Sequence, residues 1–381
     1  MMPKSFMFIA GETSGDLLAA ELAAALRRKC PEAVFFGAGG PKMAAAGVDL
    51  AFDLTKHSVI GITDALKGYF KFRRFLNQLL ALALERKPDV VVGIDYGGFN
   101  LRLGEAIRRE ARKAGANWNP KIVQFVSPQV WASRAKRAER MAADYDLLLS
   151  IFPFEKAWYT QRVPQFRVDF VGHPMIDRLG NLAKNVAAWP NSQRPPRILL
   201  LPGSRVGELR RHLPPMLEAW KLIQKKLPNA TANMVVPNES LKELATTMGA
   251  TVNIQIGDLA GALQQADVAI ASTGTVTMEC AFFGVPTVTL YKTSTITYEI
   301  VRRIITVKSL TMPNLLAGEK VYPEFVQHEA TAANISEAAL KLLEDGALRA
   351  QIKGQLAGIV ASLGQPGAAG RAADSILSLF P

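Results

Sequence analysis

The sequence predicts an α/β protein with two doubly wound domains, each a parallel sheet covered by helices on both faces. Continuous apolar runs of strand length alternate with helical stretches, which is typical of parallel sheets. The turn-rich polar segment Asn181 to Pro196 interrupts this alternation, which then restarts, so we interpret the segment as a linker. The length of 381 residues also favours two domains, at roughly 150 residues each.

The first half contains apolar runs that suit buried strands. They are Ser5 to Ala10, Val34 to Gly37, Val90 to Ile94, Ile122 to Val126, Leu147 to Ile151 and Phe166 to Val171. Helical stretches rich in Ala, Leu, Arg and Glu lie between several of them, as at Leu17 to Arg28 and Leu101 to Ala114. Pro41 is expected to start a short helix that Gly47 ends.

The second half repeats the pattern. Its expected strands are Arg197 to Leu201, Ala232 to Val236, Val252 to Ile256, Val268 to Ala271 and Thr287 to Leu290. A helix through Leu213 to Lys226 follows the first of these strands, and the tail from Glu337 is helical apart from an interruption at Gly364 to Gly367. Two such halves are expected to leave a cleft between them, with ligands at the carboxyl ends of the strands.

The composition excludes several protein classes. An apolar fraction of 49% and a charged fraction of 20% fit an ordinary globular protein, and two cysteines and four histidines leave little material for a disulfide framework or a zinc site. The excess of 45 Lys and Arg over 33 Asp and Glu, a net charge of +12, suggests an anionic partner: nucleic acid, a phosphorylated ligand or a membrane surface.

No targeting segment or membrane span is expected. The apolar run after Lys4 is too short, and Glu12 follows it too soon, for a secretory signal. No stretch reaches the ~18 uninterrupted apolar residues of a membrane span. We therefore expect an intracellular protein whose membrane contact, if any, is peripheral.

Two glycine-rich turns follow the first two strands. In the turn Gly11 to Asp16, glycine lets the backbone approach a ligand and the following helix N-terminus favours an anion, which makes Ser14 and Gly15 candidate binding residues. The alternative is a tight turn in which Ser14 or Asp16 caps the helix. The turn Gly37 to Gly40 is expected to be a plain loop, because Lys42 stands where the dinucleotide fingerprint needs its third glycine.

Asp95 follows a buried strand, at the sheet edge where open α/β sheets present catalytic side chains. A carboxylate there can act as a general base, and the alternative is a turn former or helix cap. The loop Ser127 to Trp131 follows the next strand, with Arg134, Lys136 and Arg137 just after it. These basic residues suit either an anionic ligand or a solvated helix face.

The second half offers two phosphate-binding candidates. Gly203, Ser204 and Arg205 follow its first strand, and a glycine turn with a guanidinium suits phosphate recognition. The stretch Ser272, Thr273, Gly274 and Thr275 ends a strand and opens a helix, whose free N–H groups and hydroxyls form a diphosphate cradle that needs no metal. Glu279, one turn further on, is placed to accept hydrogen bonds from a ribose. The alternative is an ordinary capped helix.

The segment Leu66 to Leu84 is an amphipathic helix with many aromatic residues. One stripe carries Tyr69 and Phe70, while Phe75 lies outside it beside Lys71 and Arg74. A core helix with a solvated basic face explains this pattern, and so does a helix on a membrane surface.

Together these stretches resemble lipid-A-disaccharide synthases, inverting glycosyltransferases of lipid A biosynthesis in Gram-negative bacteria. The resemblance covers most of the chain and depends on the order and number of its blocks. The blocks are Ala10 to Asp16, Val92 to Asn100, Val126 to Trp131, Phe152 to Lys156, Gly172 to Pro174, Leu201 to Arg205, Ser272 to Glu279 and Ser309 to Gly318.

The resemblance implies a glycosyltransferase-B fold with two Rossmann-like domains. Residues 1–180 would form the acceptor and membrane-side domain, with the C-terminal helix at about 366–381 crossing back to it, and residues 195–363 would form the UDP-sugar domain. The implied reaction joins UDP-2,3-diacylglucosamine to 2,3-diacylglucosamine 1-phosphate, giving a β-1,6-linked disaccharide 1-phosphate and UDP. It is an inverting displacement without metal or cofactor.

The resemblance also implies roles for particular residues. Asp95 aligns with the family's proposed base, Arg205 with its second-domain arginine, and Glu279 and Asn314 with its functional glutamate and asparagine. Acylated substrates place the protein at the anionic cytoplasmic face of the inner membrane. This favours membrane contact by the aromatic residues Tyr69, Phe70, Phe72 and Phe75. A homodimer is left open.

The chain departs from the family at two places. The family often reads Asp-x-Pro-Asp-Phe-Asn, and here Gly97 and Gly98 replace the proline and the second acidic residue. Ser133 stands where a second tryptophan is common. The rival hypotheses are another UDP-sugar glycosyltransferase or an epimerase with a soluble substrate, and a nucleic-acid-binding protein, which the charge alone suggests and no motif supports.

Overall fold

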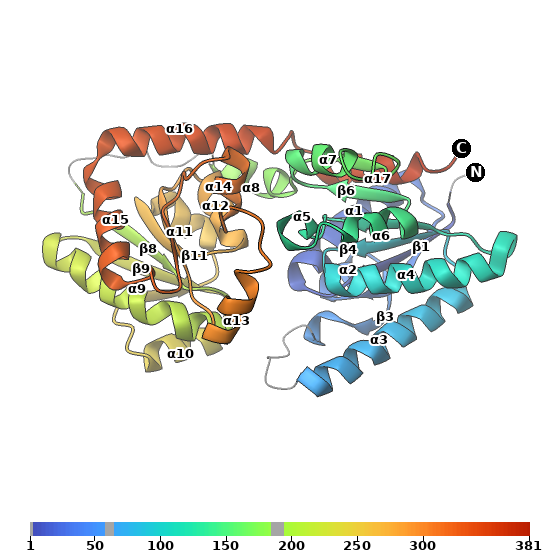
Figure 1. Ribbon diagram of the computed structural model, residues 1–381, viewed down its shortest axis with the longest axis horizontal. Helices are drawn as coiled ribbons and strands as arrows, with labels where there is room; N and C mark the ends of the chain where they lie inside the picture. Colours follow the sequence, from blue (N-terminus) through green and yellow to red (C-terminus); the bar gives the residue numbers. More distant parts are fainter. Residues whose placement is uncertain (1–2, 58–64, 184–193) are drawn as a thin grey trace. The chain divides into compact units, whose positions relative to one another are not determined.

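The computed structural model describes residues 3–57, 65–183 and 194–381. The chain divides into two compact units (Figure 1). Unit 1 comprises Met1–Asp177 together with Leu363–Pro381, and unit 2 comprises Arg178–Ser362. Among the described residues, no helix is both long and apolar enough to cross a bilayer.

Unit 1 contains a seven-stranded parallel sheet in the order β3-β2-β1-β4-β5-β6-β7. Its strands are β1 (Ser5–Ala10), β2 (Val34–Gly39), β3 (Asp49–Asp53), β4 (Val90–Ile94), β5 (Lys121–Phe125), β6 (Leu147–Ser150) and β7 (Val168–Phe170). The predicted strands are confirmed to within a few residues, but β3 was not predicted. It is an edge strand with an acidic residue at each end, so it lacks the continuous apolar run of the central strands.

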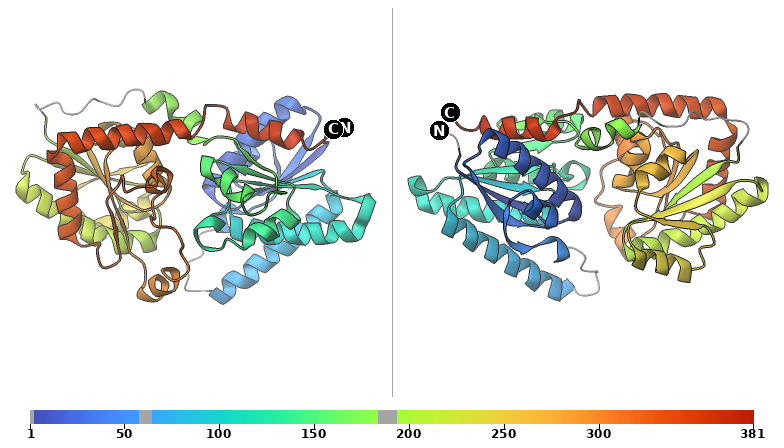
Figure 2. Two further views of the ribbon diagram at one scale, coloured as in Figure 1. Left: turned by 45° about the horizontal axis from the view of Figure 1, so that its top comes forward. Right: turned by 180° about the vertical axis from the view of Figure 1, so that it is seen from behind.

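Helices cover both faces of this sheet (Figure 2). They are α1 (Thr13–Lys29), α2 (Pro41–Ala45), α3 (Ala65–Arg86), α4 (Gly97–Ala114), α5 (Val130–Ser133), α6 (Arg137–Asp144), α7 (Pro153–Thr160) and α17 (Ala368–Leu377), with 3₁₀ turns at Thr55–His57 and Gly115–Asn117. The C-terminal helix α17 packs beside α1, where Lys29 Nζ lies 2.8 Å from Asp374 Oδ1. Helix α4 packs against both α3 and α6.

Unit 2 contains a six-stranded parallel sheet in the order β10-β9-β8-β11-β12-β13. Its strands are β8 (Arg197–Leu201), β9 (Thr231–Val236), β10 (Asn253–Ile256), β11 (Val268–Ser272), β12 (Thr287–Tyr291) and β13 (Glu324–Val326). The short edge strand β13 was not predicted. Its helices are α9 (Val206–Lys226), α10 (Glu239–Thr247), α11 (Leu259–Gln265), α12 (Thr275–Phe282), α13 (Thr295–Val301), α14 (Met312–Ala317), α15 (Ala332–Glu344) and α16 (Gly346–Ser362). Helix α8 (Met175–Ala183) spans the division between the units.

The strand register brings the predicted loops of each unit to one edge. In unit 1, Ala10 pairs with Ile94, and Ile94 pairs with Phe125, so the segments that follow β1, β4 and β5 leave the sheet together. In unit 2, Leu201 pairs with Ala271, which brings the turns after β8 and β11 together in the same way. The turns after β1, β4 and β5 therefore lie at the carboxyl edge of one sheet, and those after β8 and β11 at the carboxyl edge of the other.

Candidate active site

The backbone at Asp95 is held in an uncommon conformation. Asp95 and Tyr96 have φ of 49° and 44°, in the left-handed region that residues other than glycine rarely adopt. The N–H of Asp95 donates to the Phe125 carbonyl at 2.8 Å. The Asp95 carbonyl accepts from Asn100 Nδ2 and Gln124 Nε2, each at 2.9 Å. These bonds fix the position of Asp95, and strain of this kind is concentrated at functional sites.

The surroundings of Asp95 favour its protonated form. Burial, followed by the negative charge of Glu12, raises the pKa of the Asp95 carboxyl, whereas a hydrogen bond from the N–H of Tyr96 lowers it. A carboxylate with a raised pKa is a stronger proton acceptor near neutral pH. Glu12 was not among the predicted site residues, although its charge acts on Asp95.

The turn after β1 packs directly against this residue. A Cβ on Gly11 would overlap the ring of Tyr96, and a Cβ on Gly15 would lie 3.4 Å from the Ile94 carbonyl oxygen and 3.8 Å from Asp95 Cβ. Gly15 is buried, and Ser14 is exposed on the first turn of α1. The structure therefore places the turn that contains Ser14 and Gly15 close to Asp95. Contact of these two residues with a ligand stays a prediction.

Asp16 does not cap α1. A turn in which Ser14 or Asp16 caps this helix was the alternative interpretation of the segment. The buried carboxylate of Asp16 accepts from the backbone N–H groups of Gly40, Lys42 and Met43 at 2.8–3.0 Å. A Cβ on Gly40 would lie 2.6 Å from Asp16 Oδ2. Because this carboxylate already occupies the N-terminus of α2, the turn after β2 is a structural loop, as predicted, and no dinucleotide site.

A buried polar network that the sequence analysis missed lies beneath the loop after β5. Glu155, 1% exposed, accepts from Trp131 Nε1 at 3.0 Å, and Ser127 Oγ lies 3.1 Å from the hydroxyl of Tyr159. Burial raises the pKa of Glu155 to about 7, although hydrogen bonds from Trp131 and from Ser150 and Ser127 lower it. Glu155 thus anchors the loop through a group that titrates near neutral pH.

In unit 2, the backbone of the turn after β8 requires glycine at position 203. Gly203 has φ of 120°, and a Cβ there would lie 2.5 Å from Glu208 Oε2. That oxygen accepts the Ser204 N–H at 3.0 Å, and the other carboxylate oxygen lies 3.2 Å from Arg205 Nη1. The Arg205 side chain is 69% exposed, so its guanidinium remains accessible to a ligand.

His212 joins this turn to the segment that follows β12, and no motif pointed to it. Its ring is fully buried. Nδ1 lies 2.9 Å from the Pro202 carbonyl and Nε2 accepts the Lys292 N–H at 3.0 Å, so the proton is on Nδ1. Burial lowers the pKa of His212, which agrees with a neutral ring. The residue therefore has a positioning role.

The turn after β11 opens helix α12 without a side-chain cap. Gly274 is the N-cap residue, has φ of 136° and carries no side chain that could occupy the first N–H groups. Thr275 is exposed, while Ser272 is buried at the end of β11. An uncapped helix N-terminus beside hydroxyls suits an anion, in agreement with the predicted diphosphate cradle. Contact with a ligand stays a prediction.

The other two predicted residues of unit 2 differ in accessibility. Glu279 is half-buried, and burial raises its pKa while the charge of Arg178 opposes the shift. Asn314 is 1% exposed. Its Nδ2 donates to Tyr322 O at 2.8 Å and to Glu324 Oε1 at 2.9 Å, and its Oδ1 accepts the Tyr322 N–H at 2.7 Å. These bonds give Asn314 a structural task, so its role at a ligand stays a prediction.

The predicted membrane residues of α3 also differ from one another. Phe70 is 63% exposed. Phe72 and Phe75 are half-buried and pack on the core, with ring centres 4.9 Å from Phe99 and 5.1 Å from Phe52. The side chain of Tyr69 lies outside the described residues. Of the predicted set, Phe70 is therefore the side chain that is shown to be accessible.

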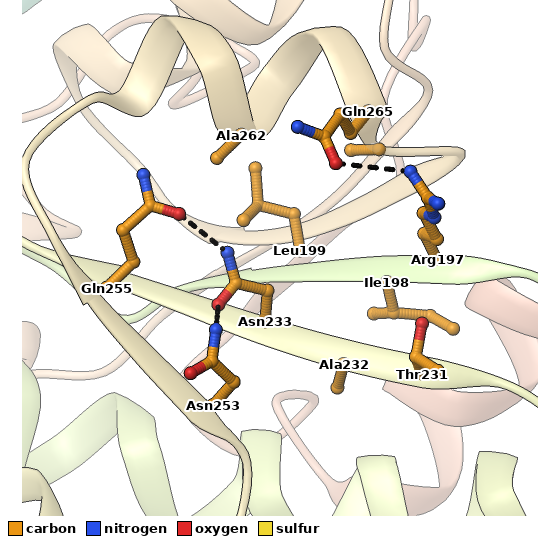
Figure 3. A pocket seen from close by; sticks show the side chains of 11 residues that line it. Arg197, Ile198, Leu199, Thr231, Ala232, Asn233, Asn253, Gln255, Ala262 and Gln265 are labelled. Carbon is orange, nitrogen blue, oxygen red and sulfur yellow. Dashed lines mark hydrogen bonds between the residues drawn. The ribbon is translucent and has the colours of Figure 1, made fainter.

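A pocket in unit 2 lies away from these residues (Figure 3). It is formed at the start of β8, β9 and β10, beneath α11, so it is at the amino edge of the sheet. Its polar groups bind one another: Asn233 Nδ2 donates to Gln255 Oε1 at 3.1 Å, and Asn253 Nδ2 donates to Asn233 Oδ1 at 2.8 Å. Ligands of open α/β sheets bind at the opposite edge, so we do not take this pocket as the active site.

No cluster of three or more His, Cys, Asp and Glu side chains that could hold a metal ion occurs in residues 3–57, 65–183 and 194–381. The groups suited to a negatively charged ligand are instead helix N–H groups and arginines.

Comparison with known proteins identifies clear relatives. A family model described as lipid-A-disaccharide synthetase matches residues 6–368. The lipid-A-disaccharide synthase of Myxococcus xanthus is 37% identical over 100% of this chain and 98% of its own length. That of Dechloromonas aromatica is 38% identical over 88% of each chain. These relatives are similar to the chain along nearly its whole length.

Solved structures share the fold at low identity. A UDP-N-acetylglucosamine 2-epimerase from Neisseria meningitidis, bound to UDP-N-acetylglucosamine, has a TM-score of 0.66 at 12% identity and covers 98% of this chain and 100% of its own. The calicheamicin glycosyltransferase CalG4 has a TM-score of 0.60 at 16% identity, covering 99% and 98%. The expected glycosyltransferase-B class, with two parallel-sheet α/β domains, is thereby confirmed.

Proposed function

The chain belongs to the lipid-A-disaccharide synthase family, a family of glycosyltransferases, and from this premise we propose its substrates and mechanism. It transfers 2,3-diacylglucosamine from its UDP derivative to 2,3-diacylglucosamine 1-phosphate. The products are the β-1,6-linked disaccharide 1-phosphate and UDP. The single observation that supports this most strongly is the full-length family match combined with a fixed, half-buried Asp95 at the carboxyl edge of unit 1.

Asp95 is assigned as the general base. The acceptor's primary hydroxyl attacks C1 of the donor sugar and gives its proton to the Asp95 carboxylate. The bond between C1 and the UDP oxygen breaks as the new C1–O bond forms, and UDP leaves with the electron pair. Attack from the face opposite UDP inverts the configuration at C1. The raised pKa of Asp95 supports this role, because a stronger base removes the proton more effectively.

Unit 2 is assigned to the UDP group. The N–H groups that open α12, with Ser272, Thr273, Gly274 and Thr275, would hold the diphosphate, while Glu279 accepts from the ribose. Gly203, Ser204 and the exposed Arg205 would meet the charge that develops on the leaving group. Ser14 and Gly15 are assigned to the donor sugar. Asn314 is assigned a positioning role, because it binds Tyr322 and Glu324 and so holds the segment that contains them.

Membrane contact is assigned to accessible apolar side chains in each unit. In unit 1 this is Phe70, beside Lys71 and Arg74 on α3. In unit 2, Ile296 is 75% and Ile300 52% exposed on α13, a helix with no buried residue. Apolar groups next to basic ones suit an anionic bilayer, and both proposed substrates are acylated. The cytoplasmic face of the inner membrane follows as the expected location, and a homodimer stays a prediction.

The product assay tests the proposed function. The protein is incubated with UDP-2,3-diacylglucosamine and 2,3-diacylglucosamine 1-phosphate in detergent, and the products are identified by mass spectrometry and by the anomeric proton coupling. A β-linked disaccharide 1-phosphate with equimolar UDP is expected. Turnover of UDP-N-acetylglucosamine to its epimer, or transfer to a soluble acceptor only, would favour the rival enzyme class instead.

A further inference from the structure

Four arginines of unit 1 lie on the segments that follow β4 and β5, the strands after which Asp95 and the loop Ser127 to Trp131 come. They are Arg102 on α4, Arg134 just after α5, and Arg137 and Arg140 on α6. Helices α4 and α6 both run from the carboxyl to the amino edge of the sheet and pack side by side (Figure 1). Arg108 and Arg112 of α4 donate to the carbonyls of Asp144 and Ala143, each at 2.9 Å, which joins the far ends of the two helices.

This register places the arginines together near the carboxyl edge. Arg102 precedes Arg108 by six residues, and Arg137 precedes Asp144 by seven. At about 1.5 Å per residue, Arg102 lies roughly 10 Å closer to the carboxyl edge than Arg108, and Arg137 lies roughly 10 Å closer to it than Asp144. The Arg137 N–H donates to the Arg134 carbonyl at 2.9 Å, which brings the loop arginine to the same place.

The positive charges of the cluster are not neutralised by ion pairs, although Glu139 lies between Arg137 and Arg140 on α6. Within the described part of the chain, none of the four arginines forms an ion pair. Two basic residues further along α4 do form ion pairs: Arg108 pairs with Asp146 at 2.5 Å and Lys113 with Glu110 at 2.9 Å. Burial, and then the charges of Arg134, Arg102 and Arg140, lower the pKa of Arg137, so these three side chains lie close enough to act on it. Such a group is suited to a bound anion.

The cluster is carried by the elements that follow Asp95, and one of its arginines lies on an aromatic ring. Helix α4 begins two residues after Asp95, and a Cβ on Gly97 would lie 2.6 Å from Cβ of Pro128, in the loop that leads to Arg134. The Arg102 guanidinium carbon lies 5.1 Å from the ring centre of Phe72 on α3. A ligand here would meet charge on one side and aromatic groups on the other.

We propose that Arg102, Arg134 and Arg137 bind the phosphate monoester of the acceptor, and so orient its hydroxyl toward Asp95. This inference rests on the proposed function and deepens it. Guanidinium groups bind phosphate oxygens through paired, charge-assisted hydrogen bonds, and the doubly charged monoester offsets the repulsion among the arginines. The acyl chains of the same molecule would lie along Phe72 and Phe70.

The acceptor phosphate and the phosphates of a bilayer share this chemistry, so the test separates them. Arg102→Gln and Arg137→Gln are compared with wild type, using a short-chain 2,3-diacylglucosamine 1-phosphate that needs no vesicle. Arg109→Gln is the matched control. Arg109 lies two turns further along the same face of α4, and its substitution removes the same charge as Arg102→Gln. We expect the acceptor KM to rise about tenfold to a hundredfold in the first two variants.

The phosphate-free acceptor completes the test. With 2,3-diacylglucosamine, the variants and wild type should differ by less than about threefold, since the arginines then have no phosphate to bind. An equal loss on both acceptors would overturn the proposal, and so would an unchanged acceptor KM together with weaker binding to anionic vesicles. Calorimetry measures binding of the short-chain 1-phosphate without donor, so it tests the arginine site even if no disaccharide forms. Failure of the proposed phosphate site can therefore be told apart from failure of the proposed function.

Discussion

At the scale of single residues, the acidity of Asp95 and of Glu155 is set by groups that lie far from them in the sequence: Glu12 acts on Asp95, and Trp131 bonds to Glu155. The apolar run Val90 to Ile94 was enough to place Asp95 at a strand's end, because a buried parallel strand has a characteristic length and composition. The closeness of Glu12 depends on the pairing of β1 with β4, and the bond between Trp131 and Glu155 joins segments that are distant in sequence. No local pattern records such contacts, which set the pKa values on which the chemistry depends.

Glu155 supplies a pH prediction. Its pKa of about 7 in the folded protein lies above the ordinary glutamate value of 4.5, so between these pH values the folded state holds a proton that the unfolded chain has lost. The free energy of unfolding should therefore fall as the pH rises through this window, by up to about 1.4 kcal/mol per pH unit.

Glu155→Gln, which stays neutral and still accepts from Trp131, should lack this loss. Calorimetric Tm values at pH 5 and pH 8 measure it. The Tm of the variant relative to wild type should be higher at pH 8 than at pH 5. A difference that is the same at both pH values would show that Glu155 does not titrate in this window.

At the scale of elements, the central strands were predicted and the edge strands were not. β3 and β13 are short and carry acidic residues, so they lack the apolar signal of a strand buried on both faces. Helix α9 extends back to Val206 and contains Pro214 and Pro215, which mark a helix boundary in sequence patterns. In α3, helical spacing showed an aromatic helix, but it could not show which aromatic residues serve the core.

The exposed apolar residues give a prediction for membrane binding. Phe70→Ser, and Ile296→Ser together with Ile300→Ser, should each reduce sedimentation with anionic vesicles several-fold, because each removes exposed apolar area that the bilayer would bury. Leu222→Ser is the matched control, since Leu222 is 41% exposed on α9. Tm should be nearly unchanged in all of them. Vesicle binding equal to wild type in both sets would refute the membrane assignment.

At the scale of the whole molecule, the sequence resemblance and the structure agree on the family and the fold. Repeated alternation of strand and helix predicted two parallel-sheet domains, and the ordered motifs predicted the family. The net charge of +12 indicated an anionic partner without locating it. We propose its location from ion pairing: most of the basic residues on α4 have carboxylate partners, and within the described residues Arg102, Arg134 and Arg137 form no ion pair.

The absence of a metal requirement is a prediction for the complete enzyme. If the N–H groups of α12 and Arg205 meet the charge of the diphosphate, turnover after exhaustive chelation should stay within about twofold of the untreated rate, since these donors need no ion. Disaccharide formation is measured with and without a chelator, and with magnesium added back. Complete loss that magnesium restores would contradict the assignment.

Asp95 is assigned to remove the acceptor proton and unit 2 to hold UDP, and one paired measurement tests both roles. For Asp95→Asn and Arg205→Ala, kcat for disaccharide formation and the Kd for UDP are determined together. Asp95→Asn should lower kcat by roughly 10²–10⁴-fold with the Kd for UDP near wild type, because the amide keeps the shape and loses the basicity. Arg205→Ala should instead raise the Kd for UDP about tenfold or more. A near-normal kcat in Asp95→Asn, or a loss of UDP binding in that variant, would contradict the account.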